Sequence, residues 1–268
     1  MSYDDRSHVI GVGQPSLEEY ENVKDENDAM QLESRVKDAM LGKHSPFNEK
    51  NNNSSSLRFV LALDIGYSTN SNLNVAAGII YDTISNEIVV QKVLSQSIPS
   101  FEYKPGLLAF REVPLLAKVA KDLLSDESYT NLATANLHQT TANDIVLMCD
   151  GNGTLHPRLC GLACHLGILF GLPAFGVGKT YLIGAPKDFH NSSDEFAYSL
   201  TSQSHIKDPD KVDFHPLKSI LPSLRGSISQ IDAVKMTLAL CTEYRQPEPI
   251  RIVDHLGRME IRRLEKDK

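Results

Sequence analysis

The sequence predicts an α/β domain built around a mixed sheet, and two observations carry this prediction. Three strand-like segments follow one another from residue 57, in "LRFVLALDIGYS", "NVAAGIIYD" and "EIVVQKVLSQ". Short turns rich in Asn, Asp and Ser separate them, which is typical of an antiparallel meander. Helical and strand-like segments alternate after the meander, which indicates helices packed against a sheet.

The elements after the meander are predicted one by one. A helix follows the Pro-Gly pair in "KPGLLAFREVPLLAKVAKDLL", and "DIVLMCD" is a short apolar strand that suits a buried parallel position. "CGLACHLGILFG" predicts a buried helix, and "PAFGVGK" predicts a strand that ends in a glycine turn. This order describes a ribonuclease-H-like layout, which is a mixed sheet flanked by helices.

The ends of the chain differ from this core in composition. Residues 1–56 predict an N-terminal extension that has one helix at about 16–41 and an Asn/Ser-rich linker, "HSPFNEKNNNSSS". Residues 57–251 form the predicted core domain. Its closing helix is "ISQIDAVKMTLALCTEYR", which we expect to end at "PEPIR" because proline cannot continue a helix. Residues 252–268 are predicted to be a charged C-terminal tail.

The composition limits the classes of function. The 268 residues carry a net charge of −7, so charge alone cannot hold a nucleic acid, and such a function needs a local site. No apolar run reaches the length of a membrane span, so no membrane partner is expected. Four cysteines without a CxxC pair indicate a reducing compartment, and we expect a monomer in the nucleus and cytoplasm.

Three acids stand where they can bind a metal ion. Asp64 interrupts an apolar strand, Asp150 ends another, and Glu112 lies in the helix after the Pro-Gly pair. If the two strands are neighbours, both aspartates meet at one edge of the sheet, where oxygen ligands suit Mg²⁺, with Mn²⁺ as the alternative. The structural alternative is that Asp64 caps a turn and that Glu112 is a solvated helix residue.

The stretch "DGNGTLHPR" (150–158) gathers further polar groups behind the second strand. Its glycines let the backbone approach a flat ligand or a phosphate, and His156 and Arg158 can hold phosphate. A tight turn would explain the glycines but not the His-Pro-Arg. Lys179 follows the next strand and can reach the same edge, or it is simply solvated. Tyr103 lies in a polar loop, where it can stack on a base or be partly buried.

Two families share features with these acids. "DIGYST" (64–69) resembles the first phosphate loop of actin-like ATPases and sugar kinases, but those proteins need two such lobes and this chain has room for one. "YKPGLLAFREVPLL" and "DGNGTLHPRLCGLACHLGILFGLPAFGVGK", with the closing "EPIR", resemble endonuclease V. That resemblance implies a ribonuclease-H-like fold. It also implies metal-dependent hydrolysis of the second phosphodiester bond 3′ to inosine or deoxyinosine, in RNA or DNA.

The resemblance assigns a role to each of the following residues. It implies that Asp64, Glu112 and Asp150 bind the metal ion, and that Lys179 completes the catalytic set. It implies that Tyr103 fills the gap left by a flipped base, and that the base lies against the residues that we call the predicted base site: Gly106, Leu108, Gly151, His156, Gly161 and Leu162. Arg158 would lie near the substrate strand together with His156.

One family feature is absent. Members carry a Gly-His-Arg segment shortly before the last helix, whereas residues 221–235 here read "LPSLRGSISQIDAVK", with no histidine. His190, His205 and His215 are nearby but out of register. Two hypotheses follow. Either the protein is an endonuclease that works with three carboxylates and Lys179, or it is a weakened or inactive homologue that binds inosine-containing nucleic acid.

Overall fold

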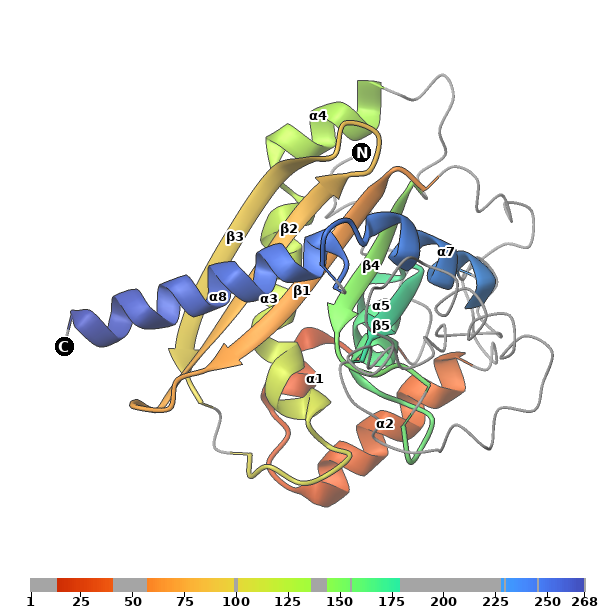
Figure 1. Ribbon diagram of the computed structural model, residues 1–268. Helices are drawn as coiled ribbons and strands as arrows, with labels where there is room; N and C mark the ends of the chain where they lie inside the picture. Colours follow the sequence, from red (N-terminus) through yellow and green to blue (C-terminus); the bar gives the residue numbers. More distant parts are fainter. Residues whose placement is uncertain are drawn as a thin grey trace, which may run out of the picture.

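The centre of the molecule is a five-stranded mixed sheet with the strand order β3-β2-β1-β4-β5 (Figure 1). The computed structural model describes residues 14–40, 57–98, 101–135, 144–154, 156–178, 228, 230–244 and 246–267. The strands are β1 (Phe59–Tyr67), β2 (Leu73–Asp82), β3 (Glu87–Ser97), β4 (Ile145–Asp150) and β5 (Ala174–Val177). The helices are α1 (Leu17–Glu21), α2 (Glu26–Met40), α3 (Ala109–Leu124), α4 (Glu127–Ala135), α5 (Leu162–Phe170), α7 (Gln230–Leu240) and α8 (Glu248–Lys266).

The strand pairing confirms both sheet predictions. β1 pairs antiparallel with β2, and β2 pairs antiparallel with β3, so the first three strands are a meander. β4 runs parallel to β1, with Phe59 opposite Ile145 and Leu63 opposite Cys149, and β5 runs parallel to β4. The apolar run of β4 is buried over its first five residues, as a central parallel strand requires.

Helices cover both faces of the sheet, and two neighbouring residues of β2 show which helix covers which face. A Cβ atom on Gly78 would meet side chains of Val119 and Leu123, so this face packs against α3. Ala77 points the other way, because successive strand residues alternate, and its Cβ lies 4.0 Å from the Cβ position of Gly257 in α8. α8 therefore crosses the face opposite to α3 (Figure 1).

The helices predicted from "LLAFREVPLL" and "CGLACHLGILF" are α3 and α5, and both are largely buried. α5 ends at Gly171, whose φ of 61° is the left-handed conformation that commonly closes a helix. None of the described helices is both long and apolar enough to cross a membrane.

The N-terminal segment contains two described helices where one was expected. The capping box between Ser16 and Glu19 starts α1, as predicted, but α1 ends at Asn22. Asp25 then accepts hydrogen bonds from the backbone N–H groups of Asn27 and Asp28 at 2.8 and 3.0 Å, which starts a second helix. Both helices pack into the common core, although the sequence analysis set residues 1–56 apart as an extension.

The C-terminal end differs most from the prediction. The expected charged tail over 252–268 is the greater part of α8, and Pro247 is the N-cap residue of that helix. Proline ends one helix but also suits the start of the next, because the first N–H groups of a helix lack partners in any case. Ile250, Val253 and Gly257 face the sheet, so the charges belong to one side of an amphipathic helix.

Candidate active site

Asp64 and Asp150 lie side by side at one level of the sheet. Leu63 pairs with Cys149 in the parallel β1–β4 ladder, and each aspartate is the next residue along its strand. Both side chains are half-buried, and an Asp64 carboxylate oxygen accepts a hydrogen bond from the Ile65 backbone N–H at 2.8 Å. The predicted adjacency of the two strands that carry these aspartates is therefore confirmed.

Glu112 lies in the first turn of α3 and is only 6% exposed, so it is not a solvated helix residue. Burial raises the pKa of this carboxyl to about 8, and the negative charges of Asp64 and Asp150 push it in the same direction. The Tyr67 hydroxyl donates a hydrogen bond to Glu112 Oε1 at 3.3 Å, which opposes the rise. The three acids therefore share one electrostatic environment.

These acids supply hard oxygen donors, which fit Mg²⁺ or Mn²⁺ better than softer metals. Among the residues that the structure describes, no three His, Cys, Asp or Glu side chains are grouped so that together they could hold a metal ion. A pair of carboxylates such as Asp64 and Asp150 suits Mg²⁺, which keeps several of its waters and takes the remaining oxygens from a phosphate. The buried Glu112 carboxyl fits the same ion, because a cation would offset the cost of its charge.

Asp254 is a further acid that the sequence analysis missed. Asp64 pairs with Ala77, whose side chain faces Gly257 of α8, and Asp254 lies one turn before Gly257 on that helix. Its side chain is 15% exposed and forms an ion pair with Arg258. The helical spacing of the apolar residues from Ile250 onwards was the available signal, and treating 252–268 as a tail concealed it.

One half of the predicted base site is formed by two segments that are far apart in the sequence. Gly106 has a φ of 82°, and a Cβ atom there would lie 3.2 Å from Arg158 Nη1 and 3.6 Å from His156 Nε2. His156 is buried, and this burial lowers the pKa of its ring, while a hydrogen bond with the Gly106 backbone acts in the opposite direction. Leu108 and Tyr103 are exposed nearby in the sequence, Tyr103 to 53%.

The other half is a tight contact among glycines. A Cβ atom on Gly161 would lie 2.3 Å from the carbonyl oxygen of Asn152, so only glycine fits there. The Gly161 N–H donates to the Gly153 carbonyl at 2.8 Å, which closes the loop before α5. Gly151, with a φ of 155°, lies beside Leu162, whose Cδ2 would be 3.2 Å from a Cβ atom there. These glycines therefore allow a close contact between the loop and the start of α5, and the predicted approach to a flat ligand or a phosphate stays a prediction.

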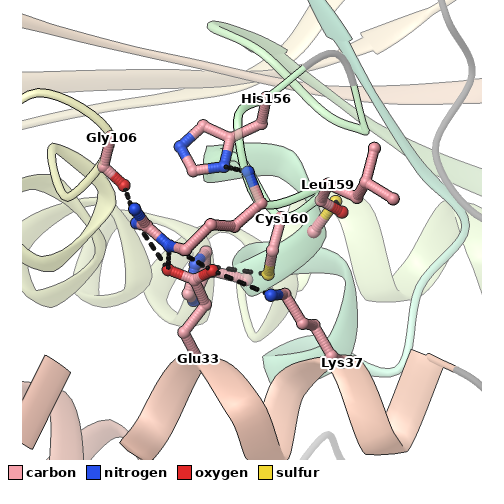
Figure 2. A network of polar contacts seen from close by, with 9 residues as sticks. Glu33, Lys37, Gly106, His156, Leu159 and Cys160 are labelled. Carbon is pink, nitrogen blue, oxygen red and sulfur yellow. Dashed lines mark hydrogen bonds and ion pairs between the residues drawn. The ribbon is translucent and has the colours of Figure 1, made fainter. Parts of the chain in front are cut away.

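Arg158 is partly buried and forms contacts within this region, and its expected place near a substrate strand stays a prediction. Its Nε donates to Glu33 Oε1 at 2.8 Å and its Nη2 to Glu33 Oε2 at 2.8 Å, and Nη2 also donates to the Gly106 carbonyl (Figure 2). The Glu33 carboxylate holds the pKa of Arg158 above its usual range. Sequence analysis missed Glu33, although it stands beside Leu32 within the apolar spacing of α2.

The remaining predicted residues lie outside the described part of the chain. These are Lys179, the three histidines at 190, 205 and 215, and most of the segment 221–235. Their proposed roles stay predictions.

A five-stranded sheet of this order, with paired aspartates on β1 and β4 and a buried glutamate on α3, defines a ribonuclease-H-like protein with an acidic centre. The family model of endonuclease V matches residues 43–255. The chain belongs to the endonuclease V family, and it is an endonuclease.

Individual relatives agree with this family. Endonuclease V of Roseiflexus castenholzii is 33% identical over 204 residues, which cover 75% of this chain and 81% of the relative. The catalytic domain of human endonuclease V is 26% identical, with a TM-score of 0.60 over 89% of this chain and 96% of that structure. Endonuclease V of Ciona intestinalis has the same fold at 22% identity, with a TM-score of 0.59 over 90% and 100%. It was crystallised with a 24mer DNA containing an inosine.

Proposed function

We propose that the protein hydrolyses the second phosphodiester bond 3′ to inosine or deoxyinosine in single-stranded RNA or DNA, with Mg²⁺ or Mn²⁺ as the cofactor. The observation that carries this proposal is the position of Asp64 and Asp150 on the neighbouring parallel strands β1 and β4, where their charges help to raise the pKa of the buried Glu112 carboxyl. The glycine contacts and His156 of the predicted base site lie in the loop that directly follows Asp150. The inosine in the crystals of the Ciona relative supports the choice of base.

The side chains divide the work according to their positions. Asp64, Asp150 and Glu112 would hold the metal ion, which when bound activates water and offsets the charge that builds up on the phosphate. The glycine backbone at 151 and 161 would lie against the flipped base and read its edge with main-chain groups. The exposed Tyr103 ring would occupy the place that the base has left.

A second candidate function rests on the sequence between 221 and 235, which lacks the family histidine. In that case the protein would bind inosine-containing strands and cleave them poorly or not at all. The intact acids favour cleavage, because a protein that only binds a base gains nothing from holding a carboxyl as costly as the buried Glu112.

Cleavage of end-labelled strands separates the two candidates. Matched RNA and DNA strands, each with one inosine, are incubated with the protein in the presence of Mg²⁺ or Mn²⁺. Parallel incubations contain EDTA instead of the metal ion. We expect a cut one nucleotide beyond the inosine. This cleavage should be lost in EDTA and in the variants Asp64→Ala and Asp150→Ala. The ratio of RNA to DNA cleavage gives the preferred sugar.

The EDTA arm also measures binding by fluorescence anisotropy. Binding that prefers the inosine strand, without cleavage by a folded protein in either metal, would support the second candidate. If the protein neither cleaves the strands nor binds the inosine strand preferentially, both candidates are rejected.

A further inference from the structure

Glu33 is a carboxylate in an unusual place. It lies on α2, on the stripe that also buries Leu32 and Val36, and it is only 1% exposed. A buried charge is costly unless it is paired and hydrogen-bonded. Lys37, one turn further along α2, approaches Glu33 Oε1 at 3.4 Å, but the closer partner is Arg158 (Figure 2).

The Arg158 guanidinium connects three parts of the chain. It binds both oxygens of Glu33, on α2, with three hydrogen bonds of 2.8, 2.9 and 2.8 Å. The Nη2 that binds Glu33 also donates to the Gly106 carbonyl, and Arg158 itself belongs to the loop that carries His156. A bidentate arginine–carboxylate pair fixes the plane of the guanidinium, so Glu33 determines where the donor to Gly106 points.

Gly106 is the most sensitive point of this connection. Its φ of 82° belongs to the left-handed region, and the turn that it forms separates Tyr103 from Leu108. The Arg158 guanidinium and the His156 ring both lie against it, at 3.2 and 3.6 Å from its Cβ position. A shift of the guanidinium would therefore move both the Gly106 turn and the His156 ring, which are two walls of the predicted base site.

We propose that Glu33 is a positioning residue for base recognition, which acts through the Arg158 guanidinium on the Gly106 carbonyl and on His156. This inference rests on the proposed function, since it assigns the selectivity for inosine partly to an N-terminal helix. α2 ends at Met40, so it lies before residue 43, where the match to the family model begins. The N-terminal segment is thereby a part of the site and not only a support for the core.

The test measures how well the full chain distinguishes strands that carry inosine from matched strands that carry adenosine. Dissociation constants are measured by fluorescence anisotropy in EDTA for Glu33→Gln, Arg158→Lys and the double variant Glu33→Gln/Arg158→Met. Glu21→Gln is the matched control, because Glu21 lies at the end of the neighbouring α1 and pairs with Lys118 of α3 at 2.7 Å on the exposed surface. Melting temperatures are recorded for every variant.

We expect Glu33→Gln and Arg158→Lys each to reduce the inosine preference by about tenfold, which is the size of one lost charge-assisted hydrogen bond. In Mg²⁺ the loss should appear in KM more than in kcat. Glu21→Gln should keep the full preference, because exposed ion pairs contribute little. The double variant removes both the Glu33 carboxylate and the Arg158 guanidinium, so neither charge is left buried without its partner. Its melting temperature should therefore recover relative to the single variants, while its inosine preference stays low.

Two results would overturn the inference. One is an unchanged inosine preference in Glu33→Gln and Arg158→Lys. The other is a double variant in which inosine preference and melting temperature recover together, which would show that the Glu33–Arg158 ion pair has a purely structural role. If Glu33→Gln alone is unfolded at the assay temperature, the double variant and Arg158→Lys decide. A wild-type protein with no inosine preference would instead reject the proposed function, so the two failures are distinct.

Discussion

Glu112 combines burial with two acidic neighbours, and at the scale of single residues this has a consequence for stability. Its pKa in the folded protein is about 8, against an ordinary value of 4.5. Between these values the folded protein binds more protons than the unfolded chain. The free energy of unfolding of the metal-free protein should therefore fall as the pH rises through this window, because the buried carboxyl must ionise.

We expect Glu112→Gln to stabilise the metal-free protein, although it removes a proposed metal ligand. The neutral amide costs less to bury and keeps an acceptor for the Tyr67 hydroxyl. The gain should be on the order of 4 kcal/mol at pH 8 and about 1 kcal/mol at pH 5. Urea unfolding in EDTA at both pH values measures it.

The exposed Glu87 on β3 supplies the control, since Glu87→Gln removes a carboxylate that is not buried. A Glu112→Gln protein that is less stable than wild type at pH 8 would show that favourable interactions other than the Tyr67 hydrogen bond keep Glu112 ionised.

Single residues were the part of the site most accessible from the sequence. Asp64, Asp150 and Glu112 interrupt or follow apolar patterns, so their types and places point to chemistry without a structure. The ion pair of Arg158 with Glu33 was not predicted, because Glu33 lies 125 residues away and no local pattern indicates a contact of that range. The backbone fit of Gly161 against Asn152 was likewise not predicted, because the glycines of this loop were interpreted as room for a ligand.

At the scale of elements, periodicity predicted the strands and the helices α3 and α5, because each of them buries a continuous apolar pattern. It failed at α8. Only Pro249, Ile250, Val253 and Gly257 are buried there, while i,i+3 and i,i+4 ion pairs such as Arg251–Glu248 and Arg263–Glu260 line the helix. A segment with few apolar residues among many charges has the composition of a disordered tail. Its helical structure becomes apparent only from the sheet face on which the apolar residues pack.

Gly257 gives α8 a direct test. It lies inside the helix, and a Cβ atom there would meet nothing nearer than 4.0 Å. We expect Gly257→Ala to raise the free energy of unfolding by roughly 0.5–1 kcal/mol, because alanine loses less backbone entropy in a helix. Gly66→Ala is the contrasting variant, since its Cβ would lie 3.0 Å from Ile261 Cδ1. Urea unfolding of both variants checks this, and a destabilised Gly257→Ala would mean that α8 packs more tightly on β2 than described.

At the scale of the whole molecule, the two ends of the chain close the structure from different sides. α8 covers one face of the sheet, whereas α1 and α2 pack beside α3 and α5 on the other side of the molecule (Figure 1). The Tyr20 hydroxyl lies 2.8 Å from His165 Nδ1 in the interior, so even the short α1 reaches α5. Residues 14–40 and α8 therefore pack into the core, although composition set both segments apart from it.

Removal of the N-terminal segment should therefore unfold the protein. The segment buries six apolar side chains in the common core: Tyr20, Ala29, Leu32, Val36, Ala39 and Met40. At about 1.5–3 kcal/mol for each of the larger ones, this burial contributes on the order of 5–10 kcal/mol, which is comparable to the whole stability of a typical domain. Its loss would also leave Arg158 without Glu33. We expect a chain that starts at residue 43 to lack near-ultraviolet circular dichroism and a cooperative urea transition. A cooperative transition close to that of the full chain would instead show that residues 57–267 fold alone, and that α1 and α2 serve recognition only.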